Sequence, residues 1–311
     1  MGQTLYLLLK TARPRQWLKN LSVYAALIFS GFFFFDFPFY FLTVTGAFIL
    51  FCILSSCIYI LNDIVDIESD KNHPFKRKRP IASGDLPIPI AMFAACVGFG
   101  TFFFLSLSLS PYFFMLGLLF IILQIFYSFK LKHFPILDVL SIAAGFIIRI
   151  YAGAVVVNLH MSVWFLLTVL SASLFLAVGK RQSERTLLAG HLGTTRKTLQ
   201  HYSQRLLDIY TGMFANTTWL TYALYAYQRD EFEPTGSVLK IFTFLPRTFT
   251  SEKWLMITVP VVIYGVMRYL QLVYEANQGE SPERVLLRDK PLLTAVILWG
   301  IMVMIIIYGM G

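Results

Sequence analysis

The sequence predicts an all-α, polytopic membrane protein, and three observations lead to that fold class. Of its 311 residues, 57% are hydrophobic and only 14% are charged, and the mean hydropathy is +0.66. Apolar stretches of about 20 residues, the length that spans a bilayer as a helix, recur along the whole chain. The connections between them alternate between short turns and longer basic segments. Because no soluble domain or low-complexity linker interrupts this pattern, residues 1–311 are expected to form one transmembrane domain.

About nine spanning helices are expected, one for each apolar run of roughly 20 residues. They lie near residues 18–36, 40–62, 88–109, 112–129, 136–157, 162–179, 206–227, 254–275 and 291–309. Short turns near 36–38, 110–111 and 158–160 join the first helix to the second, the third to the fourth and the fifth to the sixth. Basic segments at 71–87, 130–132, 180–205 and 276–290 make the next connections, and a mixed loop at 228–253 precedes the eighth helix.

The distribution of charge sets the expected orientation. The N-terminal segment and the basic connections all lie on one side of the predicted bundle, which the positive-inside rule assigns to the cytoplasm. An odd number of helices then puts Gly311 outside. The net charge of +9 is explained by this rule and by anionic lipid headgroups, so no nucleic-acid partner is predicted. Cys52, Cys57 and Cys96 lie in apolar runs at spacings that fit neither a disulfide framework nor a metal site.

An acidic stripe ends the second predicted helix. Asp63, Asp66 and Asp70 are spaced i, i+3, i+7, so they share one helix face with Asn62 beside them. Such a stripe is too costly to face lipid and is expected to line a wet cavity. Because Mg²⁺ binds through one or two carboxylates together with substrate phosphates, these four residues are the predicted metal ligands.

A strongly cationic segment, residues 71–80, follows the stripe directly. Lys76, Arg77 and Arg79 are the candidate phosphate-binding residues in it, and His73 lies in the same segment. Acidic metal ligands beside cationic phosphate ligands predict a binding site for a diphosphate.

Asp138 and Arg149 lie on one face of the fifth predicted helix. Arg149 lies ~16 Å along that helix at 1.5 Å per residue, so it needs a partner or a water-filled cavity. One interpretation is a buried structural ion pair with an acid on another helix. The other is a wall of the same cavity, with Arg149 binding an anion or orienting a metal-site acid.

Three more groups of residues have both a functional and a structural interpretation. Lys180 and Arg181, with Glu184 one turn later, would form a second phosphate-binding site or only a basic flank of the sixth helix. Lys19 would reach the site from the mouth of the first helix, or belong to a membrane-surface anchor. Tyr127 and Lys132 would line the site at the end of the fourth helix, or act as interface anchors.

The pattern Asn62-Asp63-x-x-Asp66-x-x-x-Asp70 at the end of the second helix resembles the first Asp-rich motif of the UbiA-type polyprenyl transferase superfamily. The resemblance extends over essentially the whole chain and includes the Arg13-Pro14 pair and the basic loop after helix two. It implies an α-helical membrane enzyme with a central cavity open to the cytoplasm and to lipid, and it implies use of Mg²⁺.

Two departures from the common pattern indicate a branch of that superfamily. Aromatic prenyltransferases carry a second Asp-rich motif after helix six, where this chain has Lys180-Arg181-Gln-Ser-Glu184. The Tyr-x-x-x-Lys pattern after helix four is also altered, since position 131 is Leu. The combination resembles the decaprenyl-phosphate phosphoribosyltransferase branch, which joins 5-phosphoribosyl 1-diphosphate to a polyprenyl phosphate.

This branch implies the following expectations. Asn62, Asp63, Asp66 and Asp70 would hold Mg²⁺ on the donor diphosphate, and the two basic segments would bind the donor and acceptor phosphates. The product would feed arabinose donors for cell-wall polymers, and the enzyme would lie in a bacterial inner membrane with its active site cytoplasmic. The sequence is compatible with a homo-oligomer. The alternatives are an aromatic prenyltransferase that uses a polyprenyl diphosphate and, from another class, a membrane transporter.

Overall fold

The computed structural model describes residues 2–32, 38–72, 76–187, 201–229, 253–275 and 282–309. These residues form helices and turns, and no strand occurs among them. They divide into two compact units, each described by itself below. Unit 1 comprises Met1–Leu131 and Ile148–His160, and unit 2 comprises Lys132–Ile147 and Met161–Gly311.

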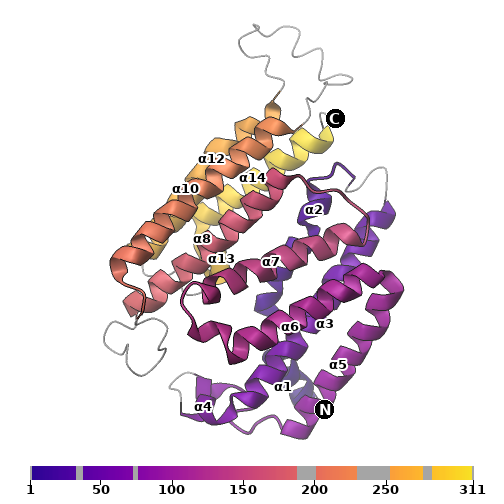
Figure 1. Cartoon of the computed structure of the whole chain (residues 1–311). Coiled ribbons are helices and arrows are strands. Elements are labelled where there is room, and N and C mark those ends of the chain that lie inside the picture. The colour runs from indigo at the N-terminus through magenta and orange to yellow at the C-terminus, as the bar shows by residue number, and fades with distance from the viewer. Residues whose placement is uncertain are drawn as a thin grey trace, which may run out of the picture. The chain divides into compact units, whose positions relative to one another are not determined.

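Unit 1 is built around a long apolar helix (Figure 1). Its elements, in chain order, are α1 (Gly2–Ala12), the 3-10 helix η1 (Pro14–Tyr24), α2 (Ala25–Ile28), α3 (Pro38–Val65), α4 (Ile67–Lys71), the 3-10 helix η2 (Lys76–Lys78), α5 (Ile88–Leu109) and α6 (Pro111–Phe129). The helix α3 packs against α5, α6, α1 and η1. Its buried face includes Phe51, which packs edge-on against Phe113 and Phe120 of α6.

The helix α7 (Leu137–Val155) contributes its first half to unit 2 and its second half to unit 1. In unit 1 it passes very close to η1. A Cβ atom at Gly153 would lie 1.8 Å from the backbone oxygen of Val23, so only glycine permits this approach. The close approach positions Arg149, one turn earlier on α7, beside η1.

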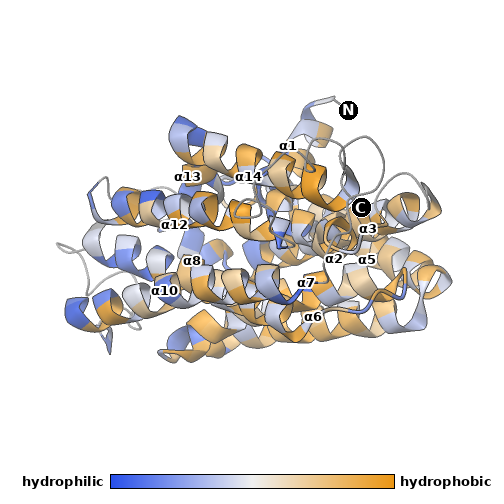
Figure 2. Ribbon diagram, turned by 90° about the horizontal axis from the view of Figure 1, so that it is seen from above, coloured by the Kyte–Doolittle hydropathy of each residue, from blue (hydrophilic) through white to orange (hydrophobic). Residues whose placement is uncertain are grey.

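Unit 2 contains the remaining long helices, which are α8 (Val163–Leu187), α10 (Gln204–Gln228), α12 (Val259–Tyr274) and α14 (Lys290–Gly309). The 3-10 helix η6 (Trp254–Thr258) leads into α12, and the short α13 (Pro282–Arg288) precedes α14. The helix α8 packs along α10, and α12 along α14. Figure 2 shows hydrophobic residues along most of the length of the helices, with hydrophilic residues gathered at α13 and at one end of α10.

Among the described residues, seven helices are long and apolar enough to cross a membrane. They coincide with seven of the predicted spans, so the polytopic, all-helical fold class is confirmed. The count of nine is not confirmed. The run at 206–227 forms α10 but is not among these seven helices, because polar residues are spread along it. The run at 18–36 contains most of η1 and α2, and its residues 33–36 lie outside the described part of the chain.

Candidate functional site

The acidic stripe lies where α3 passes into α4. The helical hydrogen bonding continues across this junction, since the backbone N–H of Asp66 donates to Asn62 O at 2.9 Å and that of Asp70 donates to Asp66 O at 2.8 Å. The predicted spacing therefore holds for Asp63 and Asp70, which are both buried and face the same guanidinium group. Asp66 is half-buried at the junction itself. The Oδ1 atom of Asn62 accepts a hydrogen bond from Ser128 Oγ of α6 at 3.2 Å.

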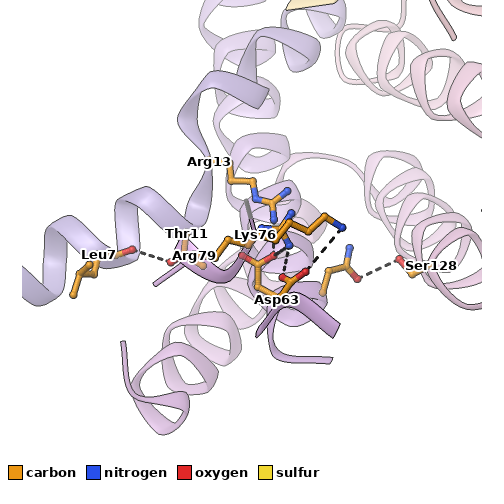
Figure 3. A network of polar contacts seen from close by, with 9 residues as sticks. Leu7, Thr11, Arg13, Asp63, Lys76, Arg79 and Ser128 are labelled. Carbon is orange, nitrogen blue, oxygen red and sulfur yellow. Dashed lines mark hydrogen bonds and ion pairs between the residues drawn. The ribbon is translucent and has the colours of Figure 1, made fainter. Parts of the chain in front are cut away.

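Arg79 joins the two buried carboxylates. Its Nη1 atom lies 3.0 Å from Asp63 Oδ1 and 2.5 Å from Asp70 Oδ2. Lys76 Nζ lies 3.9 Å from Asp70 Oδ1. Partial burial, and after it the positive charge of Arg79, lowers the pKa of the Lys76 ammonium. Figure 3 shows the side chains of Lys76, from η2, and of Arg79, directly after it, gathered beside Asp63.

Arg13, which precedes Asp63 in the chain, also contacts the Asp63 carboxylate. Its Nη2 atom donates to Asp63 Oδ1 at 2.5 Å, and its guanidinium carbon lies 5.0 Å from the centre of the Tyr59 ring. Arg13 has a left-handed backbone, with φ 55° and ψ 63°, at the corner between α1 and η1. A non-glycine residue in this conformation costs on the order of 1–3 kcal/mol, and such strain is concentrated at functional sites.

A cavity of about 240 Å³ opens beside Asp63. Five cationic side chains and a single carboxylate line it, together with Thr11 and Pro80; the charged residues are Lys10, Arg13, Asp63, Lys76, Lys78 and Arg79. This charge balance suits a polyanionic ligand. Lys10, Arg13 and Lys78 were not among the predicted site residues. In the sequence, only the position of Arg13 directly before Pro14 indicates a role in the site. The positive-inside rule already accounts for the charges of Lys10, Arg13 and Lys78.

Arg149 is buried in unit 1 and contacts η1 and α6. Its Nε atom donates to Asn20 Oδ1 at 2.9 Å, and its guanidinium carbon lies 4.7 Å from the centre of the Phe120 ring. Asn20 in turn donates through Nδ2 to Ser55 Oγ of α3 at 3.0 Å. The predicted need for a polar partner is therefore met by an amide that ties three elements together.

Asp138 and Arg181 form a second cluster, in unit 2. Arg181 Nε lies 2.8 Å from Asp138 Oδ2, and both side chains are almost completely buried, with exposed fractions of 1% and 0%. Arg181 also pairs with Glu184. Lys180 is different, since its side chain is 34% exposed and its Nζ lies 3.7 Å from Glu184 Oε1. The predicted i, i+4 pair is therefore present, while the adjacent Arg181 belongs to a buried ion pair.

Tyr202 completes this second cluster. Its hydroxyl donates to Asp138 Oδ1 at 2.8 Å and accepts from the backbone N–H of Ile136 at 2.5 Å. Burial, reinforced by the hydrogen bond to the Asp138 carboxylate, raises the pKa of this phenol, so the hydroxyl remains a donor. Arg185 donates to the backbone oxygen of Tyr202. These contacts fix the segment before α10 to the start of α7.

The other predicted site residues are more dispersed. Lys19 Nζ donates to Gln16 Oε1 at 2.7 Å. Arg77 is exposed on η2, and Tyr127 of unit 1 and Lys132 of unit 2 are half-buried. His73 lies outside the described residues.

The described residues contain no group of three or more His, Cys, Asp or Glu side chains arranged to hold a metal ion. Mg²⁺, however, is usually bound by one or two carboxylates and completes its coordination with water and substrate phosphates. Two carboxylates beside a cationic cavity are the donors that this mode requires. Asp70 Oδ1 is buried, and no hydrogen bond reaches it from the described residues. The donor set of Asp63 and Asp70 therefore fits a divalent cation such as Mg²⁺.

Comparison with known proteins agrees with this architecture. The model of the UbiA prenyltransferase family matches residues 20–288. The decaprenyl-phosphate phosphoribosyltransferase of Mycolicibacterium smegmatis is 32% identical over 295 residues, covering 94% of this chain and 89% of that protein. The protein of the same name from Corynebacterium glutamicum is 31% identical, covering 97% of this chain and 87% of that protein.

A solved structure has the same fold. It is a UbiA homolog from Archaeoglobus fulgidus bound to GPP and Mg²⁺, with a TM-score of 0.66 and 16% identity, covering 96% of this chain and 99% of that chain. The family model and the curated relatives each extend over most of the sequence, and the resemblance noted in the acidic motif is confirmed. The chain belongs to the UbiA prenyltransferase family.

Proposed function

We propose that this protein transfers the 5-phosphoribosyl group of phosphoribosyl diphosphate to a polyprenyl phosphate and releases diphosphate. The observation on which the proposal depends most is the cavity beside Asp63, where five cationic side chains surround one carboxylate. A diphosphate donor supplies the negative charge that this cavity requires. The relatives named decaprenyl-phosphate phosphoribosyltransferase support the same transferred group and the same class of acceptor.

The roles of the unit 1 residues follow from their contacts. Asp63, Asp66 and Asp70, with Asn62, would hold Mg²⁺, which when bound neutralises charge on the departing diphosphate. Arg13, Lys76 and Arg79 would bind the donor phosphates, with Arg77 beside them on η2. Arg149, through Asn20, would keep η1 and therefore Arg13 in place; Lys19 and Tyr127 would border the donor.

The roles of the unit 2 residues concern the acceptor. Lys180, exposed beside Glu184, would bind the lipid phosphate, with Lys132 as a further cation for it. Asp138 would hold Arg181 so that α8 presents Lys180 in a fixed position. The prenyl tail would lie along apolar helix faces.

The transfer itself needs few residues. An oxygen of the lipid phosphate attacks C1 of the ribose, and the bond from C1 to the diphosphate oxygen breaks, with its electron pair leaving on the diphosphate. A phosphate monoester has a second pKa near ~6, so it is largely dianionic at neutral pH and requires no general base. Carboxylates near C1 favour the positive charge that develops there.

We also propose that the protein spans a bacterial inner membrane many times, with its N-terminus and the cationic cavity on the cytoplasmic side and its C-terminus outside. The cavity residues come from the basic N-terminal segment and the basic 71–87 loop, which the positive-inside rule assigns to that side. The product would serve as a precursor of arabinose donors for the cell wall.

The test is direct. Purified protein in detergent with added lipid receives labelled phosphoribosyl diphosphate and a polyprenyl phosphate, with and without Mg²⁺, and label is counted in the lipid fraction. We expect Mg²⁺-dependent label that Asp66→Ala abolishes. Glu68→Ala, which removes an exposed carboxylate of α4 paired only with Lys71 in the described contacts, should leave labelling intact.

An absence of label in the wild-type protein, together with turnover of a prenyl diphosphate and an aromatic acceptor, would replace this proposal with an aromatic prenyltransferase. That second function has less support, because the last turns of α8 carry Lys180 and Arg181 where a second set of metal-binding acids is required.

A further inference from the structure

One nitrogen atom of Arg79 neutralises both buried acids of the proposed metal site. Its distances to Asp63 and Asp70 are 3.0 Å and 2.5 Å, so it lies between the two carboxylates that would bind the metal. We infer that Arg79 is a built-in counter-ion for this acid pair, displaced most readily when a divalent cation and a diphosphate bind together. The inference rests on the proposed function for the site and adds that the metal and the diphosphate promote each other's binding.

The backbone around Arg79 is fixed, so the exchange would involve the side chain alone. The Arg79 N–H donates to Lys76 O at 2.9 Å, and Arg79 O accepts from the Ser83 N–H at 2.8 Å. The next residues are anchored in a hydrophobic cluster, where Ile81 and Leu86 are 4% and 1% exposed. The Arg79 side chain, by contrast, is 26% exposed and lines the cavity. It can therefore turn from the carboxylates to a ligand in the cavity without moving the loop.

Charge explains why the two ligands should bind together. A divalent cation that arrives alone must displace Arg79 and remain among several other cations, namely Arg13, Lys76 and Lys78. A diphosphate that arrives alone finds the Arg79 guanidinium already paired with Asp63 and Asp70. When both are present, the metal takes the carboxylates and Arg79 takes the phosphate, so each ligand removes the obstacle to the other. Coupling of this kind is reciprocal between the two ligands.

Lys78 offers a matched control in the same cavity. It is adjacent in sequence to Arg79, bears the same charge and lines the same cavity, and its side chain is exposed. The ion pairs to Asp63 and Asp70 come from Arg13, Lys76 and Arg79. Removing the charge of Lys78 therefore changes the overall potential of the cavity while leaving the bridge between the two acids in place.

The experiment is a Mn²⁺ titration followed by electron paramagnetic resonance, on full-length protein in detergent, with and without inorganic diphosphate. In the absence of diphosphate, Arg79→Gln should tighten Mn²⁺ binding by roughly three- to tenfold, the effect of losing one competing ion pair. The enhancement of Mn²⁺ affinity by diphosphate should shrink by a similar factor. Lys78→Gln should leave Mn²⁺ affinity without diphosphate within about twofold of wild type and weaken diphosphate binding.

Two results would overturn the inference: Mn²⁺ binding to Arg79→Gln without diphosphate that equals or falls below wild type, or an equal gain in Lys78→Gln. Arg79→Lys keeps the charge on a shorter, single-point donor, so it should give an intermediate Mn²⁺ affinity. It provides the same test if Arg79→Gln does not fold, and an affinity below wild type would count against the exchange.

The labelled-transfer assay separates this inference from the proposed function. If wild type transfers label but Arg79→Gln has unchanged Mn²⁺ affinity, the displacement of Arg79 is refuted and the proposed phosphoribosyl transfer is retained. If the Mn²⁺ affinities change as expected but no label is transferred, the displacement of Arg79 is retained and phosphoribosyl diphosphate is refuted as the donor. A wild-type protein that binds no Mn²⁺ even with diphosphate would remove both.

Discussion

The ion cluster of unit 1 and that of unit 2 contain the same chemical groups in very different surroundings. In unit 1, Arg79 joins Asp63 and Asp70 at the wall of a cavity, and its side chain is 26% exposed. In unit 2, Arg181 joins Asp138 with exposed fractions of 1% and 0%. A guanidinium paired with a carboxylate is thus available for exchange in one cluster and enclosed in the other.

This difference teaches how to separate a binding site from a structural ion pair. An enclosed pair gains little net stability over apolar packing, but removing one partner leaves an uncompensated buried charge. A pair at a cavity is partly screened by water, so its members can change partners at low cost. By this criterion the unit 1 cluster is the better candidate for chemistry, and the unit 2 cluster for holding α7, α8 and the start of α10 together.

Replacing an aspartate by asparagine should therefore reduce stability much more in the unit 2 cluster than in the unit 1 cluster. Asp138→Asn removes the charge that balances Arg181, and we expect it to destabilise the protein by about 3 kcal/mol, at the low end for a broken buried pair because Glu184 still contacts Arg181. Asp63→Asn should cost no more than about 1 kcal/mol of stability, since its partners are partly exposed. Thermal unfolding in detergent, monitored by size-exclusion chromatography, measures both.

Activity provides the crossed control. Asp63→Asn should remove phosphoribosyl transfer while the protein remains folded, whereas folded Asp138→Asn at low temperature should retain measurable transfer, weakened only through the position of Lys180. Equal loss of stability in the two variants would show that the difference in burial does not determine what each ion pair contributes to the free energy of unfolding.

Two adjacent cations on α8 sharpen the comparison within a single turn of helix. Lys180 is 34% exposed and Arg181 is 1% exposed. We expect Lys180→Gln to raise the KM for polyprenyl phosphate roughly tenfold, as one phosphate contact is lost, without changing the unfolding temperature. Arg181→Gln should lower the unfolding temperature, because it leaves Asp138 buried without its ion pair. The reverse assignment of the two effects would make Arg181 the phosphate ligand and contradict the role proposed for Asp138.

The sequence predicted the fold class and the acidic stripe because both depend on local periodicity. Runs of about 20 apolar residues identify membrane helices, and the i, i+7 relation of Asp63 and Asp70 holds across the α3–α4 junction. The count of nine spans is not confirmed, since α10 is helical but contains many polar residues.

Partners distant in sequence were beyond this reasoning. Arg13 is 50 residues from Asp63, and its side chain reaches the carboxylate only because the chain turns through a left-handed conformation before Pro14. Asn20 and Arg149 are 129 residues apart. Tyr202 belongs to no recognisable sequence pattern, although its hydroxyl organises the unit 2 cluster. Such contacts are fixed by tertiary packing, for which a single sequence gives no periodic signal.

The smallest expected effect concerns pH and the remaining cation of the unit 1 cluster. Burial, and after it the charge of Arg79, lowers the pKa of Lys76 from its ordinary value near ~10.4. A diphosphate binds the protonated ammonium, so the contribution of Lys76 to affinity is complete below the lowered pKa and is lost as the pH rises through it. Affinity for inorganic diphosphate should fall by roughly two- to fivefold between about pH 7 and 10, as measured by calorimetry.

Lys76→Arg tests the assignment, because a guanidinium stays charged throughout this range. Its affinity should hold at alkaline pH, whereas Lys76→Gln should show the weaker alkaline affinity of wild type at every pH. A decline that persists unchanged in Lys76→Arg would come from another group, and Lys76 would then have no part in binding diphosphate. In unit 2 the corresponding donor is the Tyr202 phenol, whose pKa is raised by burial, so the same pH range should leave that cluster unchanged.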